Sequence, residues 1–316
     1  VRSLHDDDFN IFLTGSSSKL LSQEIATSLR GRTISYMLLP FSFKEFLAMK
    51  KFSLDTTKLS SHEQSVLRNL LNEYQEFGGF PEVISEKEKE EKIKIINEYF
   101  NLVVYKDIVD RYNIKNVKLI KWLIKSLTTS YTKEFSIHKV FLTLKSQGIK
   151  LSKNTLYSYL SMLEDTSFVF PLQKFSRSIR KTELSISKIY LNDISFTKLI
   201  EISKDLGKKM ENTVFLKLLR EKIPPTEIFY WKNQAQEEVD FVIKKGQSIT
   251  QLIQVCYDID DRDTKKREIR ALLKASKELK CNNLIIITQN KEGSEKIKNN
   301  KIKYVPLWKW LLEKEH

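Results

Sequence analysis

The sequence predicts an α/β and α+β multidomain protein. Its 316 residues exceed the usual size of one domain, and a hydrophobic fraction of 41% is sufficient for more than one core. Helical and strand-like spacings of apolar residues alternate along the chain, and each change of period marks a candidate boundary. We therefore expect four segments, at residues 1–50, 51–115, 116–192 and 193–316.

The composition favours a polyanionic partner. Lysine and arginine number 54 against 40 aspartate and glutamate residues, which gives a net charge of +14. The charge favours polyanions as partners without choosing among them, although a basic proteome would produce the same excess without any such partner.

The cysteines and the apolar runs of the sequence indicate the cellular compartment of the protein. Both cysteines, Cys256 and Cys281, fall in expected core elements, where they build neither a zinc site nor a disulfide framework. No apolar run approaches about 18 residues, so we expect no membrane association. The first ten residues are polar and acidic rather than a signal peptide, which favours a cytoplasmic protein. They also lack an initiator methionine, so we expect the chain to begin inside a longer reading frame.

The first two segments contain a short α/β stretch and then helices. A buried strand is expected at residues 9–14, a helix at 19–29 with Ser18 as N-cap, and a second strand at 33–38. Residues 55–100 are expected to be helical, interrupted by a turn at residues 78–81. A further helix is expected at 93–111.

Several stretches carry a family resemblance. Residues 11–18, 29–32 and 39–46 resemble the late part of an AAA+ type P-loop ATPase, specifically the prokaryotic ATPases that carry a DUF4143 region. Residues 78–82, Gly-Gly-Phe-Pro-Glu, and residues 105–112 are similar to further stretches of that family. The resemblance implies an ATP-dependent protein, in which Ser16 or Ser17 would sense the nucleotide and Arg32 would be the arginine finger. A surface position after a helix-ending glycine is the alternative for Arg32.

The sequence does not contain the whole ATPase motif set. No G-x-x-x-x-G-K-[ST] occurs, and no apolar strand with a paired acid precedes Phe9. Without that backbone cradle and its lysine, a triphosphate and Mg²⁺ have little to hold them. ATP hydrolysis by this chain alone is therefore not expected, and a homo-oligomer or a separate ATPase half is a candidate partner.

Residues 116–192 have the pattern of a winged helix. Helices are expected at 117–130, 137–147 and 153–165, followed by strands at 168–172 and 189–191. The third helix and the basic segment after the first strand would contact DNA, or the module would instead pack between domains. The residues predicted to bind nucleic acid are Lys153, Asn154, Tyr157, Ser158, Arg177, Arg180 and Lys181.

The last segment contains a hairpin with polar residues inside it. Strands are expected at 228–231, 237–243 and 252–257, with a turn around Gly246. Because side chains alternate along a strand, Asp240 is expected on the face opposite to that of Val239 and Phe241. It would share its face with Glu238 and Val242. Pairing of the last two strands would bring Asp240 and Gln254 to one point, where their oxygens suit Mg²⁺ or Mn²⁺. An ordinary hairpin with a polar face is the alternative.

This arrangement resembles the PD-(D/E)XK nuclease superfamily. The order helix, three strands, helix, strand matches the αβββαβ core of restriction-endonuclease-like domains. The resemblance implies that Glu211, Asp240 and Gln254 surround the metal and act in catalysis. Cys256 stands at the position of the motif lysine, so the site is expected to be degenerate. Geometric candidates for a relocated lysine are Lys232, Lys265 and Lys266.

Three functions follow from these observations. The first is a nucleic-acid-associated ATPase homologue with a degenerate nuclease-like domain. The second is a Mg²⁺-dependent nuclease using Glu211, Asp240 and Gln254. The third is a DNA-binding or adaptor protein without catalysis.

Overall fold

The computed structural model describes residues 34–52, 60–200, 205–297 and 299–313, together with residues 12, 14 and 15. Ser16, Ser17, Arg32 and the helix expected at 19–29 lie outside this part of the chain. The strand expected at 33–38 is wrong over residues 34–38, which form neither helix nor strand. No described strand pairs with this stretch, so its backbone lacks the partner that a strand requires.

The next part of the chain is helical. Two of its helices begin with a capping box, in which Ser42 pairs with Glu45 and Ser60 with Glu63. The long helix expected from residue 93 is divided, because its second half widens into π-helical hydrogen bonding. The elements are α3 (Phe43–Met49), α4 (Ser61–Phe77), α5 (Pro81–Ser85), α6 (Lys89–Asn101) and η1 (Leu102–Asp110).

The three helices expected at 117–165 form as anticipated. Asn116, Ser136 and Ser152 each accept a backbone N–H at the start of α7 (Val117–Thr129), α8 (Ile137–Ser146) and α9 (Lys153–Asp165). Strands β1 (Val169–Leu172) and β2 (Lys188–Leu191) pair antiparallel and flank α10 (Ile179–Glu183). Every residue of β2 is buried, so this hairpin is an internal element and not an exposed wing.

A mixed six-stranded sheet dominates the C-terminal part among the described residues. Strand order is β3-β4-β5-β6-β8-β7, with β5 parallel to β6 and β6 parallel to β8. The 3₁₀-helical η2 (Ile194–Ile200) connects β2 to this part of the chain. Its elements are α11 (Leu206–Glu221), β3 (Thr226–Lys232), β4 (Glu238–Lys245), β5 (Ser248–Cys256), α12 (Arg262–Leu279), β6 (Leu284–Thr288), β7 (Gly293–Ile297), β8 (Asn300–Pro306) and α13 (Leu307–Leu312).

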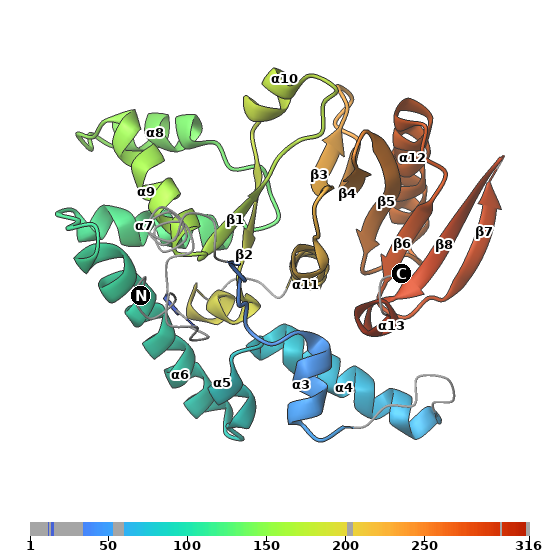
Figure 1. The fold of residues 1–316 in the computed structure, drawn as a ribbon, viewed down its shortest axis with the longest axis horizontal. Coiled ribbons are helices and arrows are strands. Elements are labelled where there is room, and N and C mark those ends of the chain that lie inside the picture. The colour runs from blue at the N-terminus through green and yellow to red at the C-terminus, as the bar shows by residue number, and fades with distance from the viewer. Residues whose placement is uncertain are drawn as a thin grey trace, which may run out of the picture.

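The sheet separates two cores. One core joins α11 and α13 to α3 and α4, whereas the other lies beneath α12. A third core fills the helical half, which occupies the left of Figure 1, with β1 and β2 lying between that half and the sheet. None of the described helices is long and apolar enough to span a membrane.

A bulge in β4 changes the expected alternation. The β3–β4 register shifts between Phe229 and Trp231, which pair with Val242 and Val239, so β4 contains one extra residue there. Val239 and Val242 consequently share the core beneath α12, whereas Phe241 packs on the α11 side. The expectation that Val242 shares a face with Asp240 is therefore wrong, because the bulge lies between them.

Candidate functional site: a buried lysine among carboxylates

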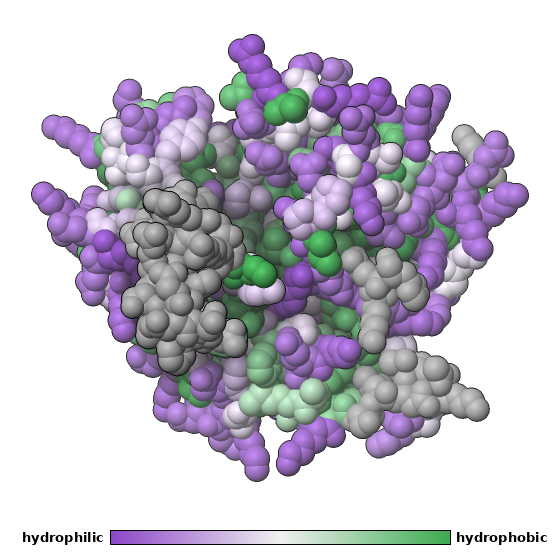
Figure 2. Space-filling model, viewed as in Figure 1, coloured by the Kyte–Doolittle hydropathy of each residue, from purple (hydrophilic) through white to green (hydrophobic). Residues whose placement is uncertain are grey.

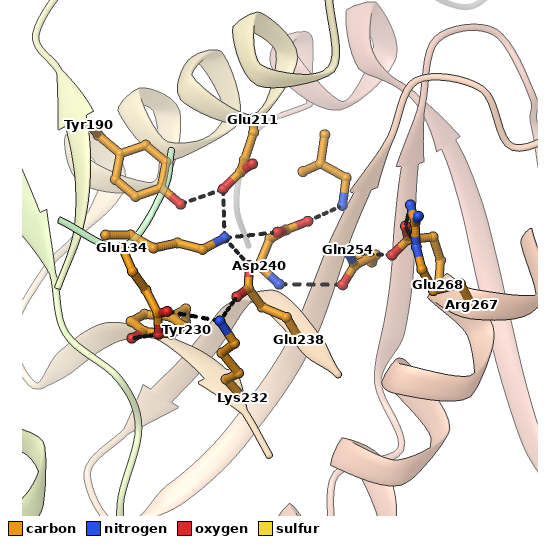
Figure 3. A network of polar contacts seen from close by, with 12 residues as sticks. Glu134, Tyr190, Glu211, Tyr230, Lys232, Glu238, Asp240, Gln254, Arg267 and Glu268 are labelled. Atoms are coloured by element: carbon orange, nitrogen blue, oxygen red, sulfur yellow. Dashed lines mark hydrogen bonds and ion pairs between the residues drawn. The ribbon is translucent and has the colours of Figure 1, made fainter. Parts of the chain in front are cut away.

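A buried ammonium group contacts three of the carboxylates labelled in Figure 3, those of Glu211, Glu238 and Asp240. Nζ of Lys188 is 2.6 Å from Oε1 of Glu238, 3.0 Å from Oε1 of Glu211 and 3.2 Å from Oδ1 of Asp240. The Lys188 side chain is only 3% exposed. Three carboxylates, from α11 and β4, thus converge on one cation from β2.

Strand geometry explains how β2 delivers this cation. Side chains two residues apart in a strand share a face, so Lys188 and Tyr190 both point at α11. The Tyr190 hydroxyl donates to Oε1 of Glu211 at 2.7 Å, and its ring stacks on Phe215 at a centroid distance of 4.1 Å. The next residue of α11, Asn212, accepts a hydrogen bond from the backbone N–H of Leu191 at 2.9 Å. Its amide group also donates to the carbonyl oxygen of Leu191 at 3.0 Å. These contacts tie β2 to α11 along its length.

The expected meeting of Asp240 and Gln254 is present. Backbone N–H of Asp240 donates to Oε1 of Gln254 at 3.3 Å, and Oδ2 of Asp240 accepts from N–H of Val255 at 2.9 Å. The Gln254 amide then donates to Glu268 at 2.7 Å. Both ends of the Gln254 side chain are therefore engaged within the protein, and its oxygen is directed at backbone.

Burial and like charge control protonation at the site. Desolvation raises the pKa of Glu211 to about 7, and Asp240 adds to this, although Lys188 acts in the opposite direction. Desolvation raises the pKa of Asp240 also. The surrounding acids, Glu211 first, hold the pKa of Lys188 well above its usual value despite burial. Because one ammonium cannot neutralise three carboxylates, a proton on Glu211 is favoured near neutrality.

Cys256 does not substitute for the motif lysine. Burial raises the pKa of its thiol to about 12, so the group is neutral and is neither a cation nor a ligand for hard metals. A lysine is nevertheless present, because Lys188 reaches the site from a different segment of the chain. Sequence inspection missed it, since Lys188 precedes Asp240 by 52 residues and matches no motif spacing. The one available signal was a lysine at the edge of an otherwise apolar strand.

The candidates named for a relocated lysine lie elsewhere. Lys232 belongs to the periphery of the network, where it contacts Glu134 at 2.8 Å and Glu238 at 3.5 Å. Lys265 pairs with Glu295, and Lys266 lines a groove on the other side of α12. The two α12 lysines are therefore wrong as candidates, because their side chains point away from Asp240.

A divalent cation does not fit this arrangement together with Lys188. Mg²⁺ requires oxygens at about 2.0–2.1 Å in near-octahedral order, and the ammonium occupies the point where the carboxylates converge. The amide oxygen of Gln254 is directed at the backbone N–H of Asp240. Within the described residues, no group of three or more histidine, cysteine, aspartate or glutamate side chains is arranged to hold a metal.

A cavity of about 700 Å³ opens beside the acids. Glu211, Glu238 and Asp240 line it from one side, and the cations Lys208 and Arg267 also border it. Arg267 is held by Glu268 at 2.6 Å. The site is thus reachable by a small molecule or a segment of polymer rather than sealed.

The residues predicted to contact DNA occupy two separate places. Asn154, Tyr157 and Ser158 are exposed on α9, and Lys153 lies 5.5 Å from the Tyr157 ring centroid. Arg177 instead donates to the backbone oxygen of Glu278 at the end of α12, at 3.1 Å. Two further predicted residues, Arg180 and Lys181, are exposed on α10.

Comparisons with known proteins divide the chain into three matched regions. An AAA domain matches residues 1–47, a domain of unknown function, DUF8612, matches 68–205, and another, DUF4143, matches 206–310. The uncharacterized protein MJ1544 of Methanocaldococcus jannaschii is 42% identical over 318 residues, covering 99% of this chain and 71% of that protein. An uncharacterized protein of Haemophilus influenzae is 28% identical over 254 residues, which is 80% of this chain but 60% of that protein. No solved structure shows a significant match.

Proposed function

This chain belongs to the AAA-like family that carries a DUF4143 domain, and from that premise we propose that it is a nucleic-acid-associated member whose nuclease-like domain does not cleave. In this proposal residues 116–192 are a winged helix whose β1–β2 hairpin packs against α11 instead of extending into solvent. ATP hydrolysis is not assigned to these residues, since the sequence has no P-loop motif.

The order of elements supports the nuclease-like part of the proposal. Helix α11, strands β3, β4 and β5, helix α12 and strand β6 follow one another as in the αβββαβ core, with β5 and β6 parallel. The acids lie on α11 and β4, the helix and the strand that the resemblance to such domains implies. A fold alone does not establish an activity, so the side chains at the site determine whether the domain can cleave.

The proposed absence of cleavage rests on the position of Lys188. Its ammonium makes the contacts that a metal would make with Glu211 and Asp240, and it is covalently part of the chain. A resident lysine offsets part of the charge of the acids but neither lowers the pKa of a water molecule nor bridges phosphate oxygens. The same contact joins β2 of the helical module to the sheet, which makes it a structural tie between the two.

A second candidate function is a nuclease with a relocated lysine. One observation favours it, namely that the lysine missing at Cys256 is supplied by Lys188 beside an open cavity. In that case Lys188 would turn away from the acids when a metal binds, and would stabilise phosphate charge.

Replacement of Lys188 separates the two candidates. We expect the Lys188→Met variant to bind one Mn²⁺ ion per chain, as measured by calorimetry. The unmodified protein should bind no Mn²⁺. Neither protein should cut plasmid DNA. Lys232→Met is the matched control, because it removes a neighbouring lysine but leaves the central ammonium. Lys188→Met combined with Asp240→Asn restores charge balance if the single variant folds poorly, and it should bind no Mn²⁺. Mn²⁺-dependent cleavage by the unmodified protein that Lys188→Met abolishes would instead establish the nuclease.

The nucleic-acid part of the proposal is supported by the exposed face of α9. Asn154, Tyr157 and Ser158 are presented together at the first two turns of this helix, as a reading helix requires. We expect a labelled duplex to bind with an affinity that falls steeply with salt, and Tyr157→Ala with Asn154→Ala to weaken it. Exposed Thr143 on α8 provides the control variant Thr143→Ala. Absence of duplex binding at low salt would remove this part of the proposal.

A further inference from the structure

A second hollow lies on the opposite side of α12 from the carboxylate cavity. It is a groove of about 1020 Å³ between α12 and the β7–β8 hairpin. The hairpin extends beyond the helix at the right of Figure 1, and hydrophilic side chains cover this part of the molecule in Figure 2. With 18 residues, α12 provides a wall about 27 Å long.

The floor of the groove is aliphatic. Ile269 and Leu273, one helical turn apart on α12, face Ile297 of β7 across it, and all three side chains are half-buried. No aromatic side chain lines the groove among the described residues. The floor therefore offers apolar contact but no surface on which a base would stack.

The rim of the groove is strongly cationic. Seven of its lining residues are lysine or arginine, and Glu295 is the one acidic residue among them. Lys265 is paired with Glu295 at 2.7 Å, and Arg270 and Lys274 are paired with Glu237 at 2.8 and 2.7 Å. No described residue supplies an ion-pair partner for the remaining four, which are Arg262, Lys266, Lys277 and Lys280.

Helical spacing arranges these unpaired cations as a stripe. Lys266, Leu273, Lys277 and Lys280 fall within a sector of about 60° when each residue turns the helix by about 100°. The stripe thus places charge beside the aliphatic floor along the whole of α12. The acidic residues of the helix, such as Asp263 and Glu278, lie off this sector.

We propose that the groove binds an acidic amphipathic helix of a partner protein. Such a helix would lay its apolar face on Ile269, Leu273 and Ile297 and direct its carboxylates at the four unpaired cations. Phosphates of a nucleic acid would satisfy the cations but would leave the aliphatic floor uncovered. Charge complementarity and the apolar floor together therefore favour a polypeptide over a nucleic acid. This interaction is independent of the function of the carboxylate site.

Synthetic peptides test the proposal directly. The probe is a labelled peptide of about 18 residues, the length of α12, with leucines at helical spacing flanked by glutamates and alanines. A matched peptide carries glutamine in place of every glutamate, and a labelled single-stranded oligonucleotide is the third probe. Binding to the full chain is followed by fluorescence anisotropy.

Charge reversal in the groove supplies the decisive comparison. We expect Lys266→Glu combined with Lys277→Glu to weaken the glutamate peptide by at least about tenfold. Lys296→Glu should not, because Lys296 is an exposed lysine on the face of β7 turned away from the groove. Circular dichroism and the melting temperature establish that the variants are folded. Three outcomes would overturn the proposal: no peptide binding, equal binding of the glutamine peptide, or loss of oligonucleotide binding alone in the double variant.

Discussion

The hydroxyl of Tyr190 lies 2.7 Å from Oε1 of Glu211, the same oxygen that the ammonium of Lys188 approaches at 3.0 Å. One carboxylate oxygen thus receives both side-chain donors that β2 directs at Glu211. The second oxygen of Glu211 receives no donor from β2, and the network as a whole contains more carboxylates than cations. Its stability should therefore depend on pH.

We expect Glu211→Gln to flatten the pH dependence of stability between about pH 5 and about pH 7. The folded pKa of Glu211, about 7, exceeds its ordinary value of 4.5, so the folded state binds more protons than the unfolded state in this window. The free energy of unfolding should consequently fall as pH rises from about 4.5 to about 7, by up to about 3 kcal/mol from this group. Urea unfolding of both proteins across the window measures the difference.

An exposed glutamate provides the control for this experiment. Glu278 on α12 has an exposed side chain, so Glu278→Gln should leave the slope of the unmodified protein unchanged. A Glu211→Gln protein with the same slope as the unmodified one would show that Glu211 is ionised at low pH like an ordinary glutamate.

Asn212→Ala should destabilise the protein by about 2–4 kcal/mol. The Asn212 amide satisfies both the N–H and the C=O of Leu191 inside the protein, and alanine would leave both backbone groups unpaired. Asn212→Asp should also destabilise, since a carboxylate accepts from the N–H but has no hydrogen for the carbonyl. Chemical denaturation gives the free energies. A cost below about 0.5 kcal/mol for the alanine variant would mean that water replaces the side chain.

Local signals in the sequence predicted much of the fold. Ser136 and Ser152 cap the helices expected from residues 137 and 153, because a serine side chain before an apolar stripe satisfies the first free N–H groups. Alternation in β5 and the turn at Gly246 likewise predicted that Asp240 and Gln254 would be neighbours. Each of these features depends on residues that are close in sequence or on one hairpin.

The features that sequence reasoning missed depend on contacts between distant segments. Lys188 enters the acid cluster only because the β1–β2 pair is buried against α11, and nothing in the spacing of β2 reveals that contact. The bulge at Asp240 was missed for the same reason, because it arises where β4 contributes one more residue than β3 to their pairing. Both lie at the site itself, where local patterns and the packed structure most often diverge.

Both cysteines should resist modification in the folded protein. Burial raises the pKa of Cys256 to about 12 and that of Cys281 above its usual value, so little thiolate is present at about pH 8. We expect a disulfide reagent to label both thiols of the folded protein much more slowly than a free cysteine. In guanidinium chloride, which unfolds the protein, both thiols should react rapidly. Fast labelling of one thiol in the native protein would show that its cover opens readily.

Gly79→Ala should destabilise the protein by about 3 kcal/mol. A methyl group at this position would lie 2.3 Å from the carbonyl oxygen of Phe41, and backbone cannot move aside as a flexible side chain does. The approach is close because N–H of Phe41 donates to the carbonyl of Gly79 at 2.8 Å, and N–H of Gly79 donates to Asp193 at 2.8 Å. Gly148→Ala is the control, since its φ of +76° is unfavourable for alanine but its surroundings are open. It should cost about 1 kcal/mol. Thermal and urea unfolding compare the two, and equal costs would mean that the turn following α4 rearranges to accept a side chain.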